Sequence, residues 1–448
     1  MSALTFQFYR GGIHFPKLAL WLDPHEPQAG PEKVFISHAH SDHIGEHREV
    51  ILSAPTAHFL RARLGGAREE HVLSFGLPAA FENGGARWRI TLLPAGHVFG
   101  SAMSWIEAEG QSLLYTGDFK LRRGLSAEPC EPRRAETLIM ETTYGQPRYQ
   151  FPPTAEVLKG VIRFCREAID NDETAVLLGY SLGKSQELLR GLADAGLPIL
   201  LHDSVFKLTR IYERLGQTFP PYGKLEGRPV AGSVLICPPL SNLSAVLPKL
   251  GRVRTAVLTG WAVDPNCRFR YQTDAAFPLS DHADFGDLVE FVKLVAPTKV
   301  FTLHGFAADF AQTLRELGFD ARALSEDEQL ALPLEVSSFS FRGPDFKLAE
   351  TAGPVPRTSE ATPGPCQEGS RTSVPRHSLS SSGLQRGFLR FAETCRAIGA
   401  VGGKLEKVRL LADYLQTLEG DRLAGSSPGS RVIHFHRATT KRCNSAGQ

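Results

Sequence analysis

Three histidines and one aspartate lie within six residues, at His38, His40, Asp42 and His43. Imidazole nitrogens and carboxylate oxygens are common ligands of zinc in proteins. The apolar stretch 34–36 predicts a buried strand that ends just before these residues. Because alternate residues of an extended chain point to the same side, His38, His40 and Asp42 can face one point. A polar loop would explain one or two histidines, but this density predicts a metal site.

Other polar residues follow further apolar stretches that predict strands. They are Asp23, His97, Asp118, Glu141 and His304. Functional loops are commonly positioned by the ends of a rigid sheet, so polar residues at predicted strand ends are candidates to lie near the histidine-rich loop. The elements that must position the site are therefore several strands whose ends meet at one edge.

The pattern at 38–43 resembles the HxHxDH signature of the metallo-β-lactamase fold, and the other ligands follow in the family's order. The resemblance implies two zinc ions, with manganese as an alternative. It also implies which residues hold them: His38, His40 and His97 for one ion, Asp42, His43 and His304 for the other, Asp118 as the bridge, and Asp23 as a support behind the cluster.

Three later motifs resemble those of the β-CASP branch of nucleases. Glu141 precedes Thr-Tyr-Gly, His282 stands in the segment SDHAD, and His304 stands in LHG. A strand-end carboxylate bonded to nearby backbone would explain Glu141 alone, but not together with His282. The resemblance implies that paired zinc ions activate water for attack on phosphorus. It makes Asp42, Glu141 and His282 catalytic residues, with His282, oriented by Glu141, protonating the leaving oxygen.

The same resemblance implies an α/β fold. An αββα sandwich would carry an inserted β-CASP cap, in which predicted strands alternate with helices. Beyond it, a Pro-, Gly- and Ser-rich stretch predicts a flexible linker, followed by a segment with helical periodicity. The predicted boundaries are core 1–149, cap 150–265, core 266–342, linker 343–386, helical segment 387–420 and disordered tail 421–448.

Residues 179–185, GYSLGKS, nearly match a phosphate-binding loop. That motif requires glycine where Leu178 stands, so nucleotide hydrolysis is not supported. The segment resembles the entry to a helix in the β-CASP cap. Because a helix N-terminus favours anions, Ser181, Lys184 and Ser185 are candidates for binding a substrate phosphate.

Composition limits the location and the partners. No apolar run is long enough to span a bilayer, and the first residues lack the pattern of a signal peptide. Seven scattered cysteines without a CxxC pair fit reduced thiols in a cytoplasm. From Lys347 onward there are 15 Lys and Arg against 8 Asp and Glu, while residues 1–346 carry 35 against 40. The catalytic region therefore needs metal ions and a local groove to handle phosphates.

Residues 1 to about 340 resemble the DNA-ligase-associated exonucleases of bacteria, on segments such as METTYGQPRYQFPP and GYSLGKSQELL. Residues 387–420 resemble the start of ATP-dependent DNA ligases, but no KxDG occurs, so we expect no ligase activity. The resemblance implies a DNA 3′-exonuclease that processes DNA ends alongside a DNA ligase. The alternatives are a ribonuclease of the messenger-RNA 3′-end processing type, a thioester or lactam hydrolase, and an inactive ligase-recruiting scaffold.

Overall fold

The computed structural model describes residues 3–9, 11–227, 231–239 and 250–324. The predicted linker, helical segment and tail (343–386, 387–420 and 421–448) lie outside the described residues. None of the helices in the described ranges is both long and apolar enough to cross a membrane. The four cysteines that the structure describes are free, in agreement with the expected reduced thiols.

The first sheet, sheet A, is mixed. Its first three strands pair antiparallel and the remaining strands add in parallel. Helix α1 (Ala54–Arg63) follows the fifth strand, with Ser53 accepting a hydrogen bond as its N-cap. In spatial order the strands are β1 (Gln7–Tyr9), β2 (Gly12–Phe15), β3 (Leu20–Leu22), β4 (Lys33–Phe35), β5 (Glu49–Ser53) and β6 (Glu69–Leu73).

The second sheet, sheet B, shows the two-residue alternation that its sequence predicts. At the start of β8, Arg87 and Arg89 are exposed while Trp88 and Ile90 are buried, and every residue from Ile90 to Pro94 is buried. In spatial order the strands are β19 (Ala321–Ala323), β18 (Lys299–Leu303), β11 (Thr137–Glu141), β10 (Gln111–Tyr115), β9 (Ala102–Ala108), β8 (Ala86–Pro94) and β7 (Pro78–Asn83).

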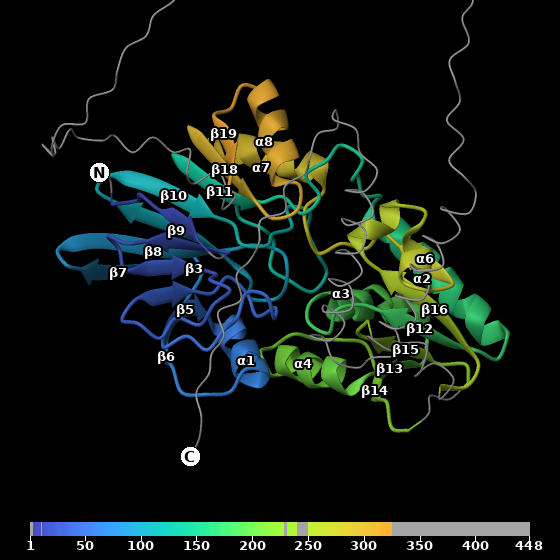
Figure 1. The fold of residues 1–448 in the computed structure, drawn as a ribbon. Helices are drawn as coiled ribbons and strands as arrows, with labels where there is room; N and C mark the ends of the chain where they lie inside the picture. Colours follow the sequence, from blue (N-terminus) through green and yellow to red (C-terminus); the bar gives the residue numbers. More distant parts are fainter. Residues whose placement is uncertain (1–2, 10, 228–230, 240–249, 325–448) are drawn as a thin grey trace, which may run out of the picture. The chain divides into compact units, whose positions relative to one another are not determined.

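Sheets A and B face each other across one apolar core, which includes Phe15 and Leu20 from sheet A and Ile90 from sheet B. Helix α1 covers the outer face of sheet A. Helices α7 (Phe285–Val295) and α8 (Ala307–Glu316) cover the outer face of sheet B (Figure 1). This order of layers is the predicted αββα sandwich, and the expected fold class is confirmed.

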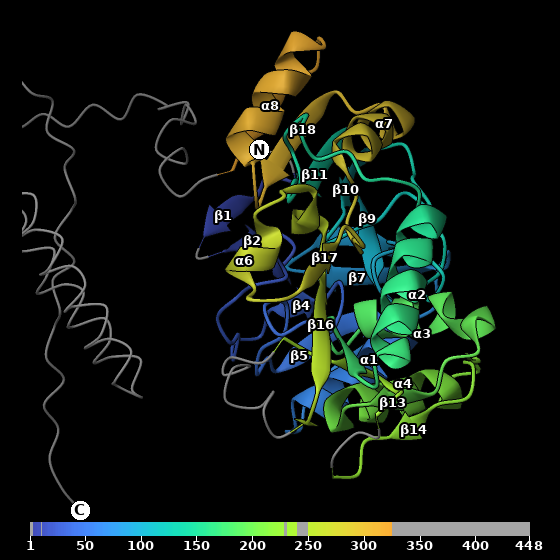
Figure 2. The same cartoon turned by 90° about the vertical axis from the view of Figure 1, so that its right-hand side faces the viewer.

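Sheet C forms the predicted cap and is entirely parallel. Its central strand β12 is buried at every residue, as expected for a parallel sheet covered by helices. The strands in spatial order are β14 (Gly223–Lys224), β13 (Ile199–Leu201), β15 (Val234–Cys237), β12 (Thr174–Leu178), β16 (Val253–Leu258) and β17 (Ala275–Phe277). Its α-helices within the described residues are α2 (Thr154–Asp170), α3 (Lys184–Gly191), α4 (Asp203–Arg214) and α6 (Cys267–Arg270) (Figure 2). Two 3-10 turns in the same described part are η1 (Ala193–Ala195) and η3 (Gly260–Val263). Strand β17 extends the cap sheet beyond residue 265, into the segment that the sequence prediction gave to the core.

The chain leaves sheet B after β11 to form the cap and returns in β18, which pairs in parallel with β11. Glu141 and Leu303 are register partners at the ends of these strands, so Glu141 and His304 emerge side by side. The cap also packs on the core through a buried cluster between α1 and α4, where Phe59 meets Ile211 and Tyr212. The strand pairing and this cluster fix the cap against the edge where the predicted ligands emerge.

Candidate metal centre and active site

The histidine-rich loop leaves the end of β4, a buried strand with parallel neighbours on both sides. His38 is fully buried, and its Nε2 lies 3.0 Å from Nδ1 of His40. Nε2 of His97 lies 3.1 Å from the same Nδ1 atom. Nitrogen ligands about 2.0–2.1 Å from a tetrahedral zinc ion lie roughly 3.3 Å from one another. The three imidazoles are therefore spaced as ligands of one ion.

Asp118 follows β10 and completes this cluster. Its Oδ2 lies 3.6 Å from Nε2 of His38 and 3.9 Å from Nε2 of His97. One ligand atom from each of His38, His40, His97 and Asp118 lies within 4.8 Å of the others. Gly117 has a φ of 53°, and a Cβ built on it would lie 2.5 Å from Cβ of Ser37. Glycine is required here because any side chain would separate the two ligand loops.

The protonation states of this cluster suit a metal ion. Burial lowers the pKa of His97 to about 3, helped by the neighbouring His282. Burial, together with His43, lowers the pKa of His38 well below its ordinary value. Burial acts to raise the pKa of Asp118, but His43 and His282 outweigh it and hold that pKa well below the usual range. Neutral imidazoles and an ionised carboxylate are the forms that bind metal, so the donor set fits zinc.

His43 connects the cluster to His304. Nε2 of His43 lies 3.4 Å from Oδ2 of Asp118, and its ring centroid lies 6.2 Å from that of His304. His304 has a φ of 60°, a left-handed conformation that is uncommon outside glycine. Thr142 Oγ1 donates to the carbonyl of His304 at 2.7 Å and holds this turn. The side chain of Asp42 is exposed and lies outside the four-residue group, so its role as a ligand stays a prediction.

Asp23 lies behind the histidines and accepts three hydrogen bonds. Its Oδ1 accepts from the backbone N–H of Ser37 at 2.8 Å. Its Oδ2 lies 3.1 Å from Nδ1 of His43 and accepts from the hydroxyl of Tyr115 at 2.9 Å. The Asp23 carboxylate therefore holds Nε2 of His43 toward Asp118. Hydrogen bonds of this kind orient metal-binding imidazoles and fix their tautomer.

Two backbone carbonyls orient the imidazoles of His40 and His97, and one of these carbonyls comes from the cap. Nε2 of His40 lies 3.1 Å from the carbonyl of Leu182, which directs Nδ1 toward the cluster. Nδ1 of His97 lies 2.8 Å from the carbonyl of Asp281, which directs Nε2 there. The carboxylate of Asp281 is in turn paired with Lys184 of the cap, with 2.7 Å between Nζ and Oδ1. The cap and the segment 280–284 therefore determine how two candidate ligands point.

His282 and Glu141 form a pair next to the cluster. Nδ1 of His282 lies 2.9 Å from Oε1 of Glu141, and Oε2 of Glu141 accepts from the backbone N–H of Thr143 at 2.8 Å. The ring centroids of His282 and His97 are 4.6 Å apart. Burial acts to lower the pKa of His282, but the carboxylates of Glu141, Asp118 and Asp281 outweigh it and raise the pKa to about 9. The raised pKa favours the protonated imidazole of His282 at neutral pH in the metal-free protein, and Nε2 of this imidazole lies 4.0 Å from Oδ1 of Asp281.

Of the predicted phosphate-binding residues, Lys184 and Ser185 are buried. The ammonium group of Lys184 forms an ion pair with the carboxylate of Asp281, and the hydroxyl of Ser185 donates to the carbonyl of Tyr180 at 2.8 Å. Ser181 is half-buried and accepts a hydrogen bond from Arg63 at 3.2 Å. The contacts of Lys184 and Ser181 tie the cap to the core, that of Ser185 lies within the cap, and phosphate binding by the three residues stays a prediction.

Sequence reasoning did not identify Asp281, Leu182 or Tyr115 as parts of the site. Asp281 stands directly before His282 in SDHAD, so its motif was visible although its contact with His97 was not. Leu182 acts through its carbonyl, which no side-chain pattern reveals. Tyr115 lies in an apolar strand, where its ring suggests core packing rather than a hydrogen bond to Asp23.

Comparison with protein families agrees with this geometry. Residues 20–146 match the model of the metallo-beta-lactamase superfamily, and residues 275–324 match the Zn-dependent metallo-hydrolase RNA specificity domain. The chain belongs to the metallo-β-lactamase superfamily, in its β-CASP branch. The predicted family is therefore confirmed, and with its cluster of histidine and aspartate ligands the chain is consistent with a metal-dependent hydrolase.

Individual relatives of this metallo-β-lactamase/β-CASP protein include proteins named for DNA metabolism. A "Probable DNA ligase" of Opitutus terrae is 49% identical over 414 residues, covering 91% of this chain and 38% of the relative. The "5' exonuclease Apollo" of Gallus gallus is 28% identical, covering 69% and 66%. The "DNA cross-link repair protein SNM1" of Arabidopsis thaliana is 26% identical, covering 60% of each. The chain thus spans less than two thirds of the length of these relatives.

Proposed function

We propose that this chain is a zinc-dependent phosphodiesterase that acts as a DNA 3′-exonuclease. The observation that carries the proposal is the pair formed by Glu141 and His282 beside the metal-ligand cluster. A hydrolase of thioesters or lactams needs the metal ligands but has no need for this additional pair. A phosphodiester does need it, because a nucleotide leaving as an alkoxide has to be protonated.

The proposed metal ligands divide into two sets that share Asp118. One set is His38, His40, His97 and Asp118, and the other is Asp42, His43, His304 and Asp118. When bound, zinc ions supply positive charge to the phosphate and lower the pKa of a nearby water. The three imidazoles of the first set stay neutral and keep their lone pairs free, while Asp118 contributes the negative charge.

His282 is the proposed general acid. Its side chain is 18% exposed whereas that of Glu141 is 1% exposed, so substrate can reach the imidazole but not the carboxylate. Glu141 holds the proton on Nδ1, and the proton on Nε2 is then available to the leaving oxygen. Such acid catalysis contributes roughly 10²–10⁴-fold to the rate. Glu141 acts through His282 and is therefore a positioning residue.

DNA is the proposed substrate because the relatives named above are a "Probable DNA ligase", a "5' exonuclease" and a "DNA cross-link repair protein". The alignment with a relative named as a ligase also supports action on DNA ends beside such an enzyme. A ribonuclease is the second candidate. It is favoured by the match of residues 275–324, which contain His282 and His304, to an RNA specificity domain.

The test uses the purified full chain with zinc or manganese. Single- and double-stranded DNA and RNA carry a label at either the 5′ or the 3′ end. We expect single nucleotides to be released from a 3′-labelled DNA strand, while a 5′-labelled strand shortens stepwise. Release of mononucleotides from the 5′ label would reverse the polarity, and faster cleavage of RNA would favour the second candidate. Turnover of thioesters or lactams without cleavage of any nucleic acid would overturn the proposal.

A further inference from the structure

Tyr180 is an exposed aromatic residue next to the metal centre. Its side chain is 59% exposed, yet its ring centroid lies only 6.2 Å from that of His40. It follows β12 and Gly179, and Nζ of Lys184 lies 5.7 Å from its ring centroid. Nucleobases of single strands stack on aromatic rings of this kind, independently of sequence. A duplex keeps its bases paired and stacked, so the ring suits an unpaired end.

Arg63 connects the surroundings of Tyr180 to a groove on the core side. Its Nη1 donates to the carbonyl of Ala39, inside the metal-binding loop, at 3.0 Å. Its Nη2 donates at 3.2 Å to Oγ of Ser181, the residue after Tyr180. Arg63 is the last residue of α1, which packs against α4 of the cap. Arg63 and Ser181 both line the groove that runs between these two helices.

This groove, the α1–α4 groove, has a volume of about 660 Å³, and its charged lining residues are all basic. Besides Arg63 they are Lys207, Arg210 and Arg214, on one helix and spaced to share a face. Asp203 pairs with Lys207 at 2.7 Å and Glu213 pairs with Arg210, but neither acid lines the groove. Nε of Arg214 donates to the backbone carbonyl of Arg210. Because this carbonyl carries no net charge, the contact does not neutralise the guanidinium.

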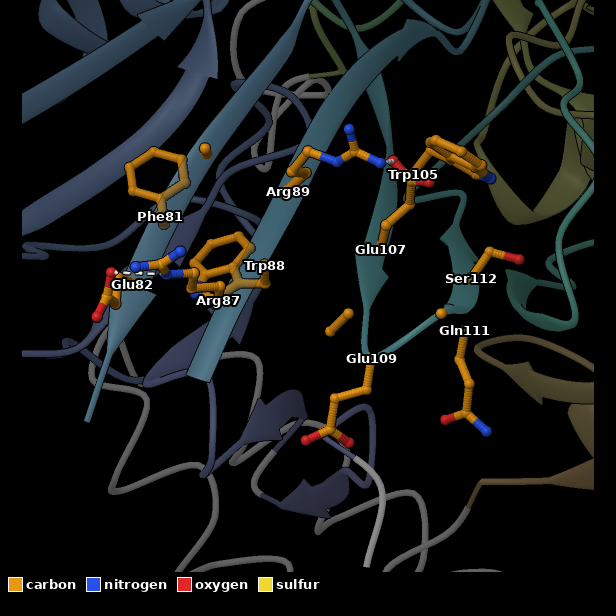
Figure 3. Close-up of a pocket in the computed structure, with 13 residues that line it drawn as sticks. Phe81, Glu82, Arg87, Trp88, Arg89, Trp105, Glu107, Glu109, Gln111 and Ser112 are labelled. Carbon is orange, nitrogen blue, oxygen red and sulfur yellow. Dashed lines mark hydrogen bonds and ion pairs between the residues drawn. The ribbon is translucent and has the colours of Figure 1, made fainter. Parts of the chain in front are cut away.

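A second hollow of about 740 Å³ shows that not every depression on this protein suits a polyanion. It lies at the ends of β7 to β10, where Figure 3 shows Phe81, Trp88 and Trp105 among charged side chains. Arg87 pairs there with Glu82 at 3.2 Å and Arg89 with Glu107 at 3.1 Å, and Glu109 adds a further negative charge. Three acidic side chains line that hollow against two basic ones, whereas no acidic side chain lines the α1–α4 groove.

We propose that a single strand of the substrate stacks a base on Tyr180 and lays its phosphates along the α1–α4 groove. This inference rests on the proposed nuclease function and adds where the strand runs beyond the metal centre. Arg63 forms the mouth of the path, and Lys207 and Arg214 contact phosphates further along. The path requires an unpaired stretch of several nucleotides, so the enzyme prefers frayed or single-stranded ends over blunt duplex ends.

The test measures binding of the zinc-loaded full chain to fluorescent oligothymidylates of increasing length. Phosphorothioate linkages keep the backbone charge and resist cleavage. We expect Tyr180→Leu to weaken binding about 5-fold or more, while Tyr180→Phe, which retains the ring, binds as the parent does. If the Phe variant binds as weakly as the Leu variant, Tyr180 does not act by stacking and its part of the path is wrong.

The groove is tested with Lys207→Gln/Arg214→Gln against a matched control, Lys159→Gln/Arg163→Gln, which removes two exposed charges from α2. For long strands we expect the slope of log Kd against log salt to fall by about 1.4 in the groove variant, or about 0.7 per phosphate contact. The control slope should not change. Equal slopes in the two variants would show that Lys207 and Arg214 do not contact phosphates, and the proposed path along the groove would be wrong.

Hydrolysis of end-labelled DNA is measured separately, so the two proposals can fail independently. If the variants show the expected binding pattern but the protein cleaves no DNA, the proposed strand path is supported and the proposed nuclease function is wrong. If the protein cleaves DNA but the groove and Tyr180 variants bind as the parent does, the nuclease function is supported and the proposed strand path is wrong. Thermal unfolding of each variant identifies any loss that comes from misfolding.

Discussion

The metal-centre cluster and a second group of histidine and carboxylate side chains differ in the kind of contact they make. In the metal-centre cluster, nitrogen atoms of His38, His40 and His97 face one another at 3.0 to 3.1 Å. In the second cluster, between β5 and β6, Nε2 of His71 lies 2.7 Å from Glu49, which also pairs with Lys33 at 2.8 Å. The first cluster gathers electron-pair donors, while the second already balances its charges.

Burial explains much of the difference. His38 and Asp118 are buried, so water cannot screen the electrostatic repulsion between the electron-pair donors that face one another in the metal-centre cluster. A bound cation is the partner that would satisfy them. In the second cluster Glu69 is 65% exposed and Lys33 supplies a cation from the protein itself. A group of histidines and carboxylates is therefore a convincing metal site only when its donor atoms face one another without a resident cation.

The largest expected effect comes from removing the shared carboxylate. In Asp118→Ala we expect metal affinity to fall by more than about 100-fold, because a ligand contributes more than the outer-shell partners for which 10–100-fold is typical. DNA hydrolysis should disappear with the metal. Elemental analysis and the end-label assay measure the two losses. Full zinc content in this variant would place the metal elsewhere.

Removing the proposed acid should separate rate from metal binding. In His282→Ala we expect kcat to fall roughly 10²–10⁴-fold, because the leaving oxygen departs without a proton. Zinc content should match that of the parent, since Nδ1 of His282 is bonded to Glu141 and His282 is not one of the proposed zinc ligands. Loss of zinc comparable to that in Asp118→Ala would make His282 a ligand instead.

The contact from the cap should tune metal affinity. Lys184→Met leaves Asp281 without its cation, and the segment whose carbonyl orients His97 loses its anchor. We expect metal affinity to fall about 10- to 100-fold in competition with a chelator. Lys120→Met is the matched control, because the Lys120–Glu187 pair is also buried and joins cap to core at 3.2 Å. Equal losses of affinity in the two variants would show a general effect on stability.

The charge on His282 can be measured directly in chelator-treated protein. Its raised pKa, about 9, means that the imidazole stays protonated through neutral pH and loses its proton as pH rises through 9. Glu141→Gln removes the nearest negative charge, so the pKa of His282 should fall toward or below the ordinary value of about 6.5. NMR titration of the imidazole signals gives both values. An unchanged pKa in the variant would remove Glu141 as its cause.

The smallest effect is expected at the second cluster. His71→Gln removes a partly exposed pair, and such pairs contribute about 0–1 kcal/mol to stability. We expect unchanged zinc content, DNA hydrolysis within about twofold of the parent, and a small shift in the unfolding midpoint. A fall in zinc stoichiometry would show that the two clusters do not differ in the way proposed.

The sequence already revealed much of the site because its ligands carry distinctive side chains at fixed points. His38 follows β4 of sheet A, while His97, Asp118 and Glu141 stand at or just after the ends of β8, β10 and β11 of sheet B. The αββα class followed from the resemblance to the metallo-β-lactamase family, while the apolar stretches by themselves predicted strands such as β8 and β12. The interpretation of Lys184 was less complete, since the sequence showed a lysine before a helix but not the carboxylate that occupies it.

The sequence by itself determined which groups are available: the histidines of the metal-centre cluster, Asp118, and the pair of His282 and Glu141. Only the tertiary structure decided how they point. The carbonyls of Leu182 and Asp281 select the nitrogen atoms of His40 and His97 that face the cluster, and Leu182 lies in the cap, 142 residues from His40. Side-chain chemistry is local and can be read from the sequence. The direction of a lone pair depends on a backbone atom that becomes a neighbour only on folding, and any residue type could supply it.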